Sequence, residues 1–114
     1  MCGITGWVDF DDDLTQTKSI LEKMTQTLSK RGPDDNGYVL FPHAALGHRR
    51  LIVVDPAGGS QPMVREAGGC KYCITYNGEL YNTDDVRKDL QSKGYHFTSR
   101  SDTEVLLVSY IAWG

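Results

Sequence analysis

The second residue of the chain is a cysteine, and its position gives one residue the means to act as both nucleophile and base. A side chain as small as that of Cys2 allows an aminopeptidase to remove Met1, which would leave a thiol and a free α-amine on the same residue. The intrinsic pKa of such an amine is about 8 and that of the thiol is about 8.5, so the amine can accept the thiol proton near neutral pH. The alternative interpretation is a small apolar residue that opens a strand.

The other residues that could act as a base or hold a metal carry weaker signals. None of His43, His48 and His96 has an acidic neighbour or a metal-ligand spacing, so we expect each to be packed or exposed. Cys70 and Cys73 form a lone C-x-x-C without the second ligand pair that zinc requires, and in an extended segment their thiols would point to opposite faces of a sheet. An odd count of three cysteines is no disulfide framework, which indicates a reducing compartment.

The composition excludes several classes of function. The 114 residues include 12 Lys and Arg against 15 Asp and Glu, a net charge of −3, and the basic residues lie between acidic ones rather than in a cluster. A nucleic-acid-binding surface is therefore not expected. No apolar run approaches the roughly 18 to 20 residues of a membrane span, and the N-terminus lacks the cationic start of a secretory signal. We expect a soluble, cytoplasmic, single domain that binds neither nucleic acid nor membrane.

Hydrophobic periodicity and turn-forming residues predict the elements that must position these side chains. The expected strands cover residues 2–10, 38–41, 44–48, 73–76 and 95–98, and the expected helices cover 14–30, 84–93 and the residues from 101 onward. Residues 51–54 are a further short apolar run. Ser101 and Glu104 have the spacing of a capping box, which predicts a helix start at Ser101, and the dipeptide Asn77-Gly78 readily forms a turn after a strand. This order of elements indicates an α+β fold.

Five short segments along the chain carry recognisable motifs. They cover residues 1–6, 31–34, 47–55, 76–82 and 101–105, and include Arg-Gly-Pro-Asp and Tyr-Asn-Gly-Glu-Leu-Tyr-Asn. In this order they resemble the glutaminase domain of the glutamine-hydrolysing asparagine synthetases from one end of the chain to the other, and those two motifs favour these enzymes over other class II amidotransferases. The resemblance implies an α+β fold of the N-terminal nucleophile hydrolase type, layered α-β-β-α with two antiparallel sheets. Because the family's glutaminase domain continues beyond Gly114, residues 1–114 would be the N-terminal part of a class II glutamine amidotransferase domain, with the fold incomplete.

The resemblance also assigns roles to residues. Cys2 is implied to be the nucleophile that attacks the side-chain carboxamide of glutamine, with its own α-amine as general base. The side-chain amide of Asn77 and the backbone N–H of Gly78 are implied to form the oxyanion hole. Arg50, which the family pattern Arg-Leu-x-Val-Val selects over Arg49, is implied to bind the α-carboxylate of glutamine. The full set of implied glutamine-binding residues is Arg50, Leu51, Val53, Val54, Asn77, Gly78, Glu79 and Asp102.

A zwitterionic substrate needs an anion opposite the cation that holds its carboxylate. The resemblance implies Glu79 and Asp102 in this role, at the α-ammonium group of glutamine. It also implies main-chain contacts around Val53 and Val54, beside Arg50.

The implied reaction is hydrolysis of glutamine to glutamate and ammonia through a γ-glutamyl thioester on Cys2. In the full-length protein the ammonia would pass to a C-terminal, ATP-dependent synthetase domain that amidates aspartate, and this domain is absent from the chain. No metal and no organic cofactor is implied for the glutaminase domain, since ATP and Mg²⁺ are expected only in the missing domain. The implied partners are glutamine and the protein's own synthetase domain, with a homodimer left open. The alternatives are another class II amidotransferase with a different ammonia acceptor, and an inactive or regulatory fragment, as would follow if Met1 is retained.

Overall fold

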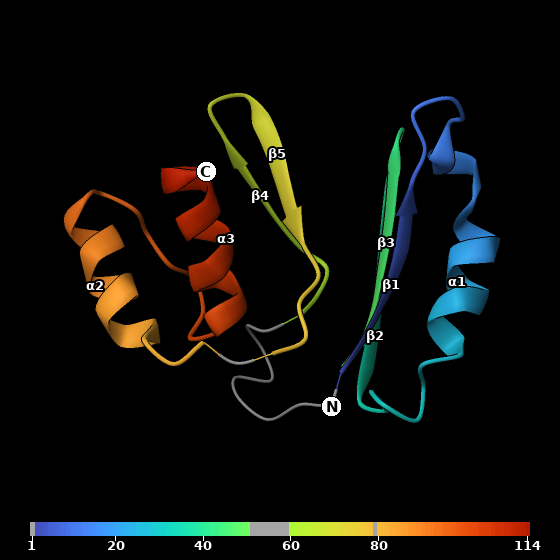
Figure 1. Ribbon diagram of the computed structural model, residues 1–114, viewed down its shortest axis with the longest axis horizontal. Coiled ribbons are helices and arrows are strands. Elements are labelled where there is room, and N and C mark those ends of the chain that lie inside the picture. The colour runs from blue at the N-terminus through green and yellow to red at the C-terminus, as the bar shows by residue number, and fades with distance from the viewer. Residues whose placement is uncertain (1, 51–59, 79) are drawn as a thin grey trace.

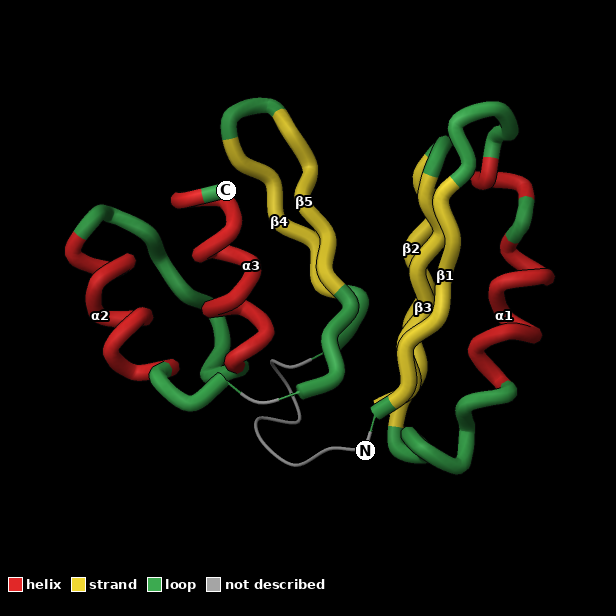
Figure 2. Tube along the Cα trace, viewed as in Figure 1, coloured by secondary structure: helices red, strands yellow, loops and turns green. Residues whose placement is uncertain are grey.

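Two antiparallel sheets and three α-helices make up the described part of the chain, which covers residues 2–50, 60–78 and 80–114 of the computed structural model (Figure 1). The first sheet contains β1 (Gly3–Val8), β3 (Ala44–Arg50) and β2 (Asp35–Phe41) in that order, and the second contains β4 (Met63–Ala67) and β5 (Cys70–Ile74). The helices are α1 (Lys18–Gln26), α2 (Thr83–Ser92) and α3 (Asp102–Trp113), with a 3-10 turn, η1 (Leu14–Gln16), before α1 (Figure 2). The prediction of an α+β fold is confirmed, while the apolar run 51–54 lies outside the described residues.

The central strand of the first sheet is β3, which pairs with both β1 and β2 in antiparallel fashion. The register places Gly3 opposite Arg49 and Asp35 opposite Arg50. The strand predicted at the N-terminus and the hairpin predicted after the first helix are both confirmed. The last residues of β3 therefore lie between the start of β1 and the start of β2.

The core of this half of the molecule lies between α1 and the first sheet. Leu14, Leu21 and Ala45 are buried there together. Gly47 lies directly under α1, because a Cβ at this position would collide with the hydroxyl of Thr25. The residues of β3 that alternate with Ala45 and Gly47 therefore point to the other face of the sheet.

The predicted helix 14–30 is instead a 3-10 turn followed by a shorter α-helix. Asp13 caps the turn by accepting a hydrogen bond from the Thr15 N–H at 3.0 Å, and the Thr17 hydroxyl donates to the Leu14 carbonyl at 2.6 Å. This local bonding accompanies a backbone at Thr17 with φ −105° and ψ 19°, outside the helical region. The α-helix consequently begins only after Thr17.

The second sheet is a hairpin whose turn is Gly68-Gly69. These glycines have φ of 58° and 80°, the left-handed conformation that two-residue hairpin turns require. Hydrophobic alternation does not predict β4, and it places the following strand at 73–76 rather than at 70–74. The reason is that β4 alternates only between half-buried and exposed residues, so polar side chains interrupt the strand pattern.

The first turn of α3 begins at the predicted residue but uses Glu104 in an unexpected way. The Ser101 hydroxyl caps the helix by accepting a backbone N–H at 3.1 Å. In a capping box Glu104 would bind the Ser101 backbone; its carboxylate instead accepts from the N–H groups of Thr98 at 2.9 Å and Ser99 at 2.8 Å. These bonds turn that backbone toward the helix, so the predicted strand 95–98 is wrong.

Glu104 is a buried charge, with 3% of its surface exposed. Burial opposes ionisation, but hydrogen bonds from the backbone and hydroxyl groups of Thr98 and Ser99 outweigh it and hold the pKa of Glu104 below its ordinary value. Arg65 of β4 adds an ion pair to the same carboxylate at 3.4 Å. The carboxylate therefore joins α3, the loop before it and β4 in one network.

The helices lie on the outer sides of the two sheets. Figure 1 shows the elements in the order α1, first sheet, hairpin, α3 and α2. Helix α1 contacts the first sheet, α3 contacts β4 and β5, and α2 contacts α3. At the end of the molecule marked N, β1 and α3 begin and β3 and β5 end (Figure 1). Among the described residues, no helix has the length and apolar character needed to span a membrane.

Replacing Glu104 with alanine is expected to lower the free energy of unfolding by about 3 kcal/mol, because the partly buried N–H groups of Thr98 and Ser99 and the guanidinium of Arg65 lose their acceptor. Glu22→Ala is the matched control, since the Glu22 carboxylate is exposed on α1 and its 3.7 Å ion pair with Lys18 contributes little. Urea denaturation followed by circular dichroism measures both variants. Equal stabilities for the two would contradict the network around Glu104.

Candidate active site

Cys2 and Arg50 lie at the same end of the first sheet. Gly3, the first residue of β1, is opposite Arg49, so Cys2 and Arg50 are the residues that follow this last pair on the two strands. Cys2 is half-buried, and Arg50 has 5% of its surface exposed. The predicted nucleophile and the predicted carboxylate-binding arginine therefore start from neighbouring backbone positions.

The loop that carries Arg-Gly-Pro-Asp packs on these two strand ends. Gly32 is required there, because a Cβ would collide with the backbone of Arg49. Arg31 donates through Nε to the Cys2 carbonyl at 3.4 Å, and Arg49 donates through Nε to the Gly32 carbonyl at 2.9 Å. The Arg49 side chain thus binds the loop, while the side chain of Arg50, the next residue of β3, points to the opposite face of the sheet.

The burial of Arg50 decides what this residue can bind. A guanidinium stays charged at neutral pH and carries five N–H donors, so a buried one needs carboxylate or carbonyl oxygens around it. Its planar fork matches the two oxygens of a carboxylate. The end of β3 therefore carries a cation suited to binding a carboxylate.

His48 is buried two positions before Arg50, on the same face of β3. Its Nε2 lies 3.2 Å from the Tyr76 carbonyl, and because a carbonyl can only accept, Nε2 carries the proton. Desolvation lowers the pKa of His48, the bond to the Tyr76 carbonyl opposes this shift, and the charge of Arg50 adds to it. The imidazole is therefore neutral at pH 7, and within the described residues its buried Nδ1 has no hydrogen-bond partner.

Asn77 and Gly78 follow Tyr76 directly, and both are exposed. The Tyr76 N–H donates to Oε1 of Gln61 at 2.6 Å, and the Tyr76 carbonyl accepts from His48. Both backbone polar groups of the residue before Asn77 are therefore hydrogen-bonded. A Cβ at Gly78 would lie 2.8 Å from the Tyr76 hydroxyl, which leaves little space for any larger residue. The hydrogen-bond donors of Asn77 and Gly78 thus follow a residue whose backbone is bonded to the side chains of Gln61 and His48.

Asp102, the first residue of α3, is joined to the chain that follows Gly78. Its Oδ2 accepts a hydrogen bond from the Leu80 N–H at 3.1 Å. Asp102 is half-buried in the first helical turn, where the helix dipole stabilises a carboxylate. The next residue, Thr103, accepts at its hydroxyl from Nε2 of Gln61 at 3.2 Å. The start of α3 is therefore bonded to the segments on both sides of β4 and β5.

The predicted site residues within the described chain are thus on connected elements. They are Cys2, Arg50, Asn77, Gly78 and Asp102. The other predicted residues, Leu51, Val53, Val54 and Glu79, lie outside the described residues. Two residues that hold the segment together, Gln61 and His48, were not predicted to do so. His48 falls inside the motif 47–55, which is a weak signal, but Gln61 lies outside all five motifs.

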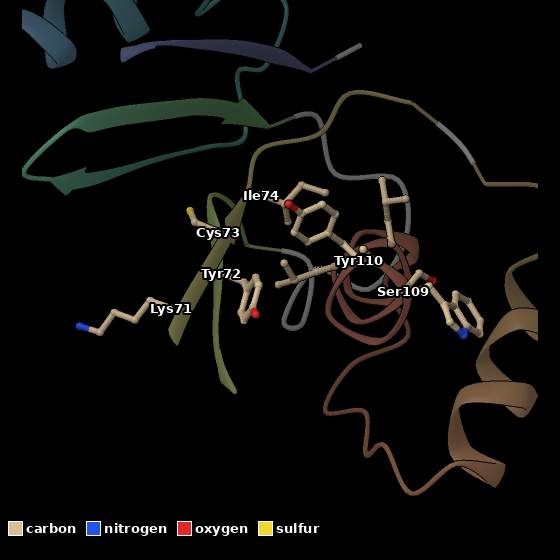
Figure 3. A pocket seen from close by; sticks show the side chains of 10 residues that line it. Lys71, Tyr72, Cys73, Ile74, Ser109 and Tyr110 are labelled. Carbon is tan, nitrogen blue, oxygen red and sulfur yellow. The ribbon is translucent and has the colours of Figure 1, made fainter. Parts of the chain in front are cut away.

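A separate cavity of about 590 Å³ lies between β5 and α3 (Figure 3). Mostly apolar side chains line it, including Tyr72, Ile74, Leu107 and Tyr110, and none of the described candidate residues is among its lining. Cys73 contributes to the lining, but its thiol lies on the other side of β5 from Tyr72 and Ile74 (Figure 3). Burial raises the pKa of this thiol to about 11, so the thiol stays protonated and is a poor nucleophile. Within the described ranges, no group of three or more His, Cys, Asp or Glu residues could hold a metal ion.

Comparison with known proteins finds relatives along the whole chain. The family described as "Glutamine amidotransferase domain" matches residues 1–114. Asparagine synthetase (glutamine-hydrolyzing) 3 of Bacillus subtilis is 58% identical over 113 residues, which cover 99% of this chain and 18% of that protein. Asparagine synthetase (glutamine-hydrolyzing) 1 of Arabidopsis thaliana is 36% identical over 114 residues, 100% of this chain and 19% of that protein. The chain thus spans less than a fifth of the length of these curated relatives.

The free energy of unfolding is expected to fall as pH drops below about 6.5, the ordinary pKa of histidine, because the unfolded chain then binds a proton that folded His48 excludes. His48→Gln removes the ionisable group but keeps an amide N–H for the Tyr76 carbonyl, so its stability should fall less between pH 7 and pH 5. His96→Gln is the control, since His96 is exposed. Urea denaturation at several pH values measures the difference, and equal pH slopes for wild type and His48→Gln would contradict a neutral, buried imidazole.

Proposed function

Because the chain belongs to the glutamine amidotransferase domain family, we propose that it hydrolyses glutamine to glutamate and ammonia, with Cys2 as the nucleophile. The observation that carries this proposal is a pair of hydrogen bonds that attach residues 76–80 to β3 and α3. One joins His48 to the Tyr76 carbonyl, and the other joins the Leu80 N–H to Asp102. They support one common site for the oxyanion donors, the carboxylate-binding arginine and the ammonium-binding aspartate beside the N-terminal cysteine.

In the first step, the Cys2 sulfur bonds to the side-chain carboxamide carbon of glutamine. The thiol proton moves to the α-amine of Cys2, which is free once Met1 has been removed. The carboxamide oxygen becomes an oxyanion, to which Nδ2 of Asn77 and the backbone N–H of Gly78 donate hydrogen bonds. The exposure of both residues supports this role, because a substrate can reach their donors.

In the second step, the C–N bond of the tetrahedral intermediate breaks. The α-ammonium of Cys2 returns its proton to the leaving nitrogen, and ammonia departs from a γ-glutamyl thioester. A water molecule, deprotonated by the same amine, then attacks the thioester through a second oxyanion, and glutamate leaves as the thiol is restored. These steps use only groups of the chain and water.

Recognition of glutamine rests on opposite charges at the two ends of its amino-acid group. Arg50 binds the α-carboxylate, and its burial supports this role because an ion pair is stronger away from water. Asp102 binds the α-ammonium together with Glu79, and its half-buried place at the start of α3 supports this assignment. The main chain of Leu51, Val53 and Val54 completes the proposed contacts, outside the described residues.

The fold and the fate of ammonia are part of the same proposal. We infer a fold of the N-terminal nucleophile hydrolase type, layered α-β-β-α, and the packing of α1 on one sheet and α3 on the other supports it. In the full-length protein, ammonia passes to an ATP-dependent C-terminal domain that amidates aspartate and holds ATP and Mg²⁺. The printed names of the relatives, asparagine synthetases, support this acceptor.

A diazo-ketone analogue of glutamine is expected to label Cys2 and no other residue, because only this thiol has both a base and a substrate pocket beside it. Intact mass shows whether Met1 is absent before labelling, and peptide mapping locates the adduct. Excess glutamine should prevent the adduct, and Cys2→Ala should abolish it. Cys70→Ala is the matched control, since Cys70 is an exposed free thiol whose loss should leave labelling unchanged. No adduct on a protein that lacks Met1, or an adduct at Cys70, would contradict the proposal.

Asn77→Ala is expected to lower kcat for glutamine hydrolysis by about 100- to 1,000-fold, the usual loss when one oxyanion donor is removed. The KM for glutamine should change much less, because the oxyanion exists only after attack. Asn82→Ala is the control: Asn82 is also exposed, and its side chain makes no capping bond to α2. Ammonia release at several glutamine concentrations measures both constants. A kcat for Asn77→Ala equal to that of Asn82→Ala would exclude Asn77 from the oxyanion hole.

A further inference from the structure

Two side chains from outside the second sheet bond to the backbone of Tyr76. The pairing of β5 with β4 reaches only to Ile74, opposite Met63. Beyond it, the Tyr76 N–H donates to Oε1 of Gln61 at 2.6 Å, and the Tyr76 carbonyl accepts from Nε2 of His48 at 3.2 Å. Both polar groups of this backbone are thus satisfied from outside the hairpin.

Gln61 is fixed on three sides. Its Nε2 donates to the Thr103 hydroxyl at 3.2 Å, so both ends of the amide are bonded. Because a backbone N–H can only donate, Oε1 must face Tyr76, and the amide has one allowed orientation. The backbone carbonyl of Gln61 lies so close to Gly37 of β2 that a Cβ on Gly37 would collide with it. Gln61 therefore couples the position of Tyr76 to α3 through its side chain and to β2 through its backbone.

His48, on the central strand of the first sheet, makes the second hydrogen bond to the backbone of Tyr76. Only 1% of its surface is exposed, and within the described residues its Nδ1 is unbonded. Leaving a buried polar atom without a partner costs stability, and an aliphatic side chain of similar size would avoid this cost. The bond to Tyr76 therefore explains a histidine at this position better than packing does.

We propose, building on the proposed glutaminase function, that Gln61 and His48 are positioning residues for the oxyanion hole. They hold Tyr76 so that Asn77 and Gly78, the next two residues, keep their donors where the oxyanion forms. This alignment matters in the transition state rather than in the bound ground state. Its loss should therefore lower kcat and leave KM nearly unchanged.

Gln61→Met keeps a similar side-chain volume but removes both hydrogen bonds of the side-chain amide. We expect it to lower kcat for glutamine hydrolysis by about 10- to 100-fold, with KM within about threefold of wild type. Thr103→Val is the matched control, because it removes only the bond to α3 and leaves the contact with Tyr76 intact. Its kcat should stay within about threefold of wild type. Gln61→Glu still offers an oxygen to the Tyr76 N–H and should recover most of the kcat.

Two variants test His48: one keeps an N–H donor for the Tyr76 carbonyl, and the other has none. His48→Gln places an amide N–H near the position of Nε2 and should keep kcat within about threefold. His48→Leu has no donor and should lower kcat about 10-fold or more, again with little change in KM. Should His48→Leu not fold, His48→Asn carries the same expectation, because its shorter amide lies near the position of Nδ1 instead.

The outcomes separate this proposal from the function on which it rests. If the wild-type chain neither hydrolyses glutamine nor reacts with the diazo-ketone at Cys2, the proposed function fails. If wild type is active and Gln61→Met and His48→Leu are equally active, the positioning role alone is overturned. It is also overturned if Thr103→Val loses as much kcat as Gln61→Met. Alkylation of Cys2 by iodoacetamide, which needs no oxyanion hole, should keep its wild-type rate in folded variants, as judged by circular dichroism.

Discussion

Polar contacts at one end of the molecule join its two sheets, and the rest of the arrangement depends on them. Within the described residues the sheets share no strand pairing, so side chains must set their relative position. His48 reaches from the first sheet to Tyr76, and the Thr75 hydroxyl donates to the Gly47 carbonyl at 3.4 Å. Because backbone groups that leave a ladder still need partners, the junction is polar. The same requirement gathers the candidate active-site residues there.

The sequence predicts the elements in which an apolar pattern is bounded by turn or capping residues. The N-terminal strand, the first hairpin and the helices α2 and α3 follow from periodicity and turn residues. The strand β4 could not be predicted in this way, because polar residues occupy much of it. The strand predicted at 95–98 does not form, because its backbone N–H groups bind Glu104, a residue whose spacing from Ser101 indicates only a helix cap.

The candidate site could be predicted as far as its residues lie in short motifs. Cys2, Arg50 and Asn77 fall in such motifs, and their chemical roles stay predictions. The contributions of Gln61 and His48 could not be predicted from the sequence, because they depend on three-dimensional contacts. His48 bonds to a residue 28 positions away, and Gln61 bonds to one residue 15 positions away and another 42 positions away. No local pattern encodes contacts over such separations.

The two cysteines of β5 differ in exposure, so their relative reactivity can be used to detect local opening of the hairpin. Cys70 is exposed, whereas Cys73 is half-buried on the face of β5 opposite to Tyr72 and Ile74 (Figure 3), and burial raises its pKa to about 11. Alkylating agents react with the thiolate, so folded Cys73 is protected both by its protonation and by its cover. When local opening exposes this face of β5 to water, the pKa of Cys73 returns to about 8.5 and the thiol becomes reactive. Its alkylation rate, with Cys70 as the internal reference, therefore measures how often this face of the hairpin opens locally.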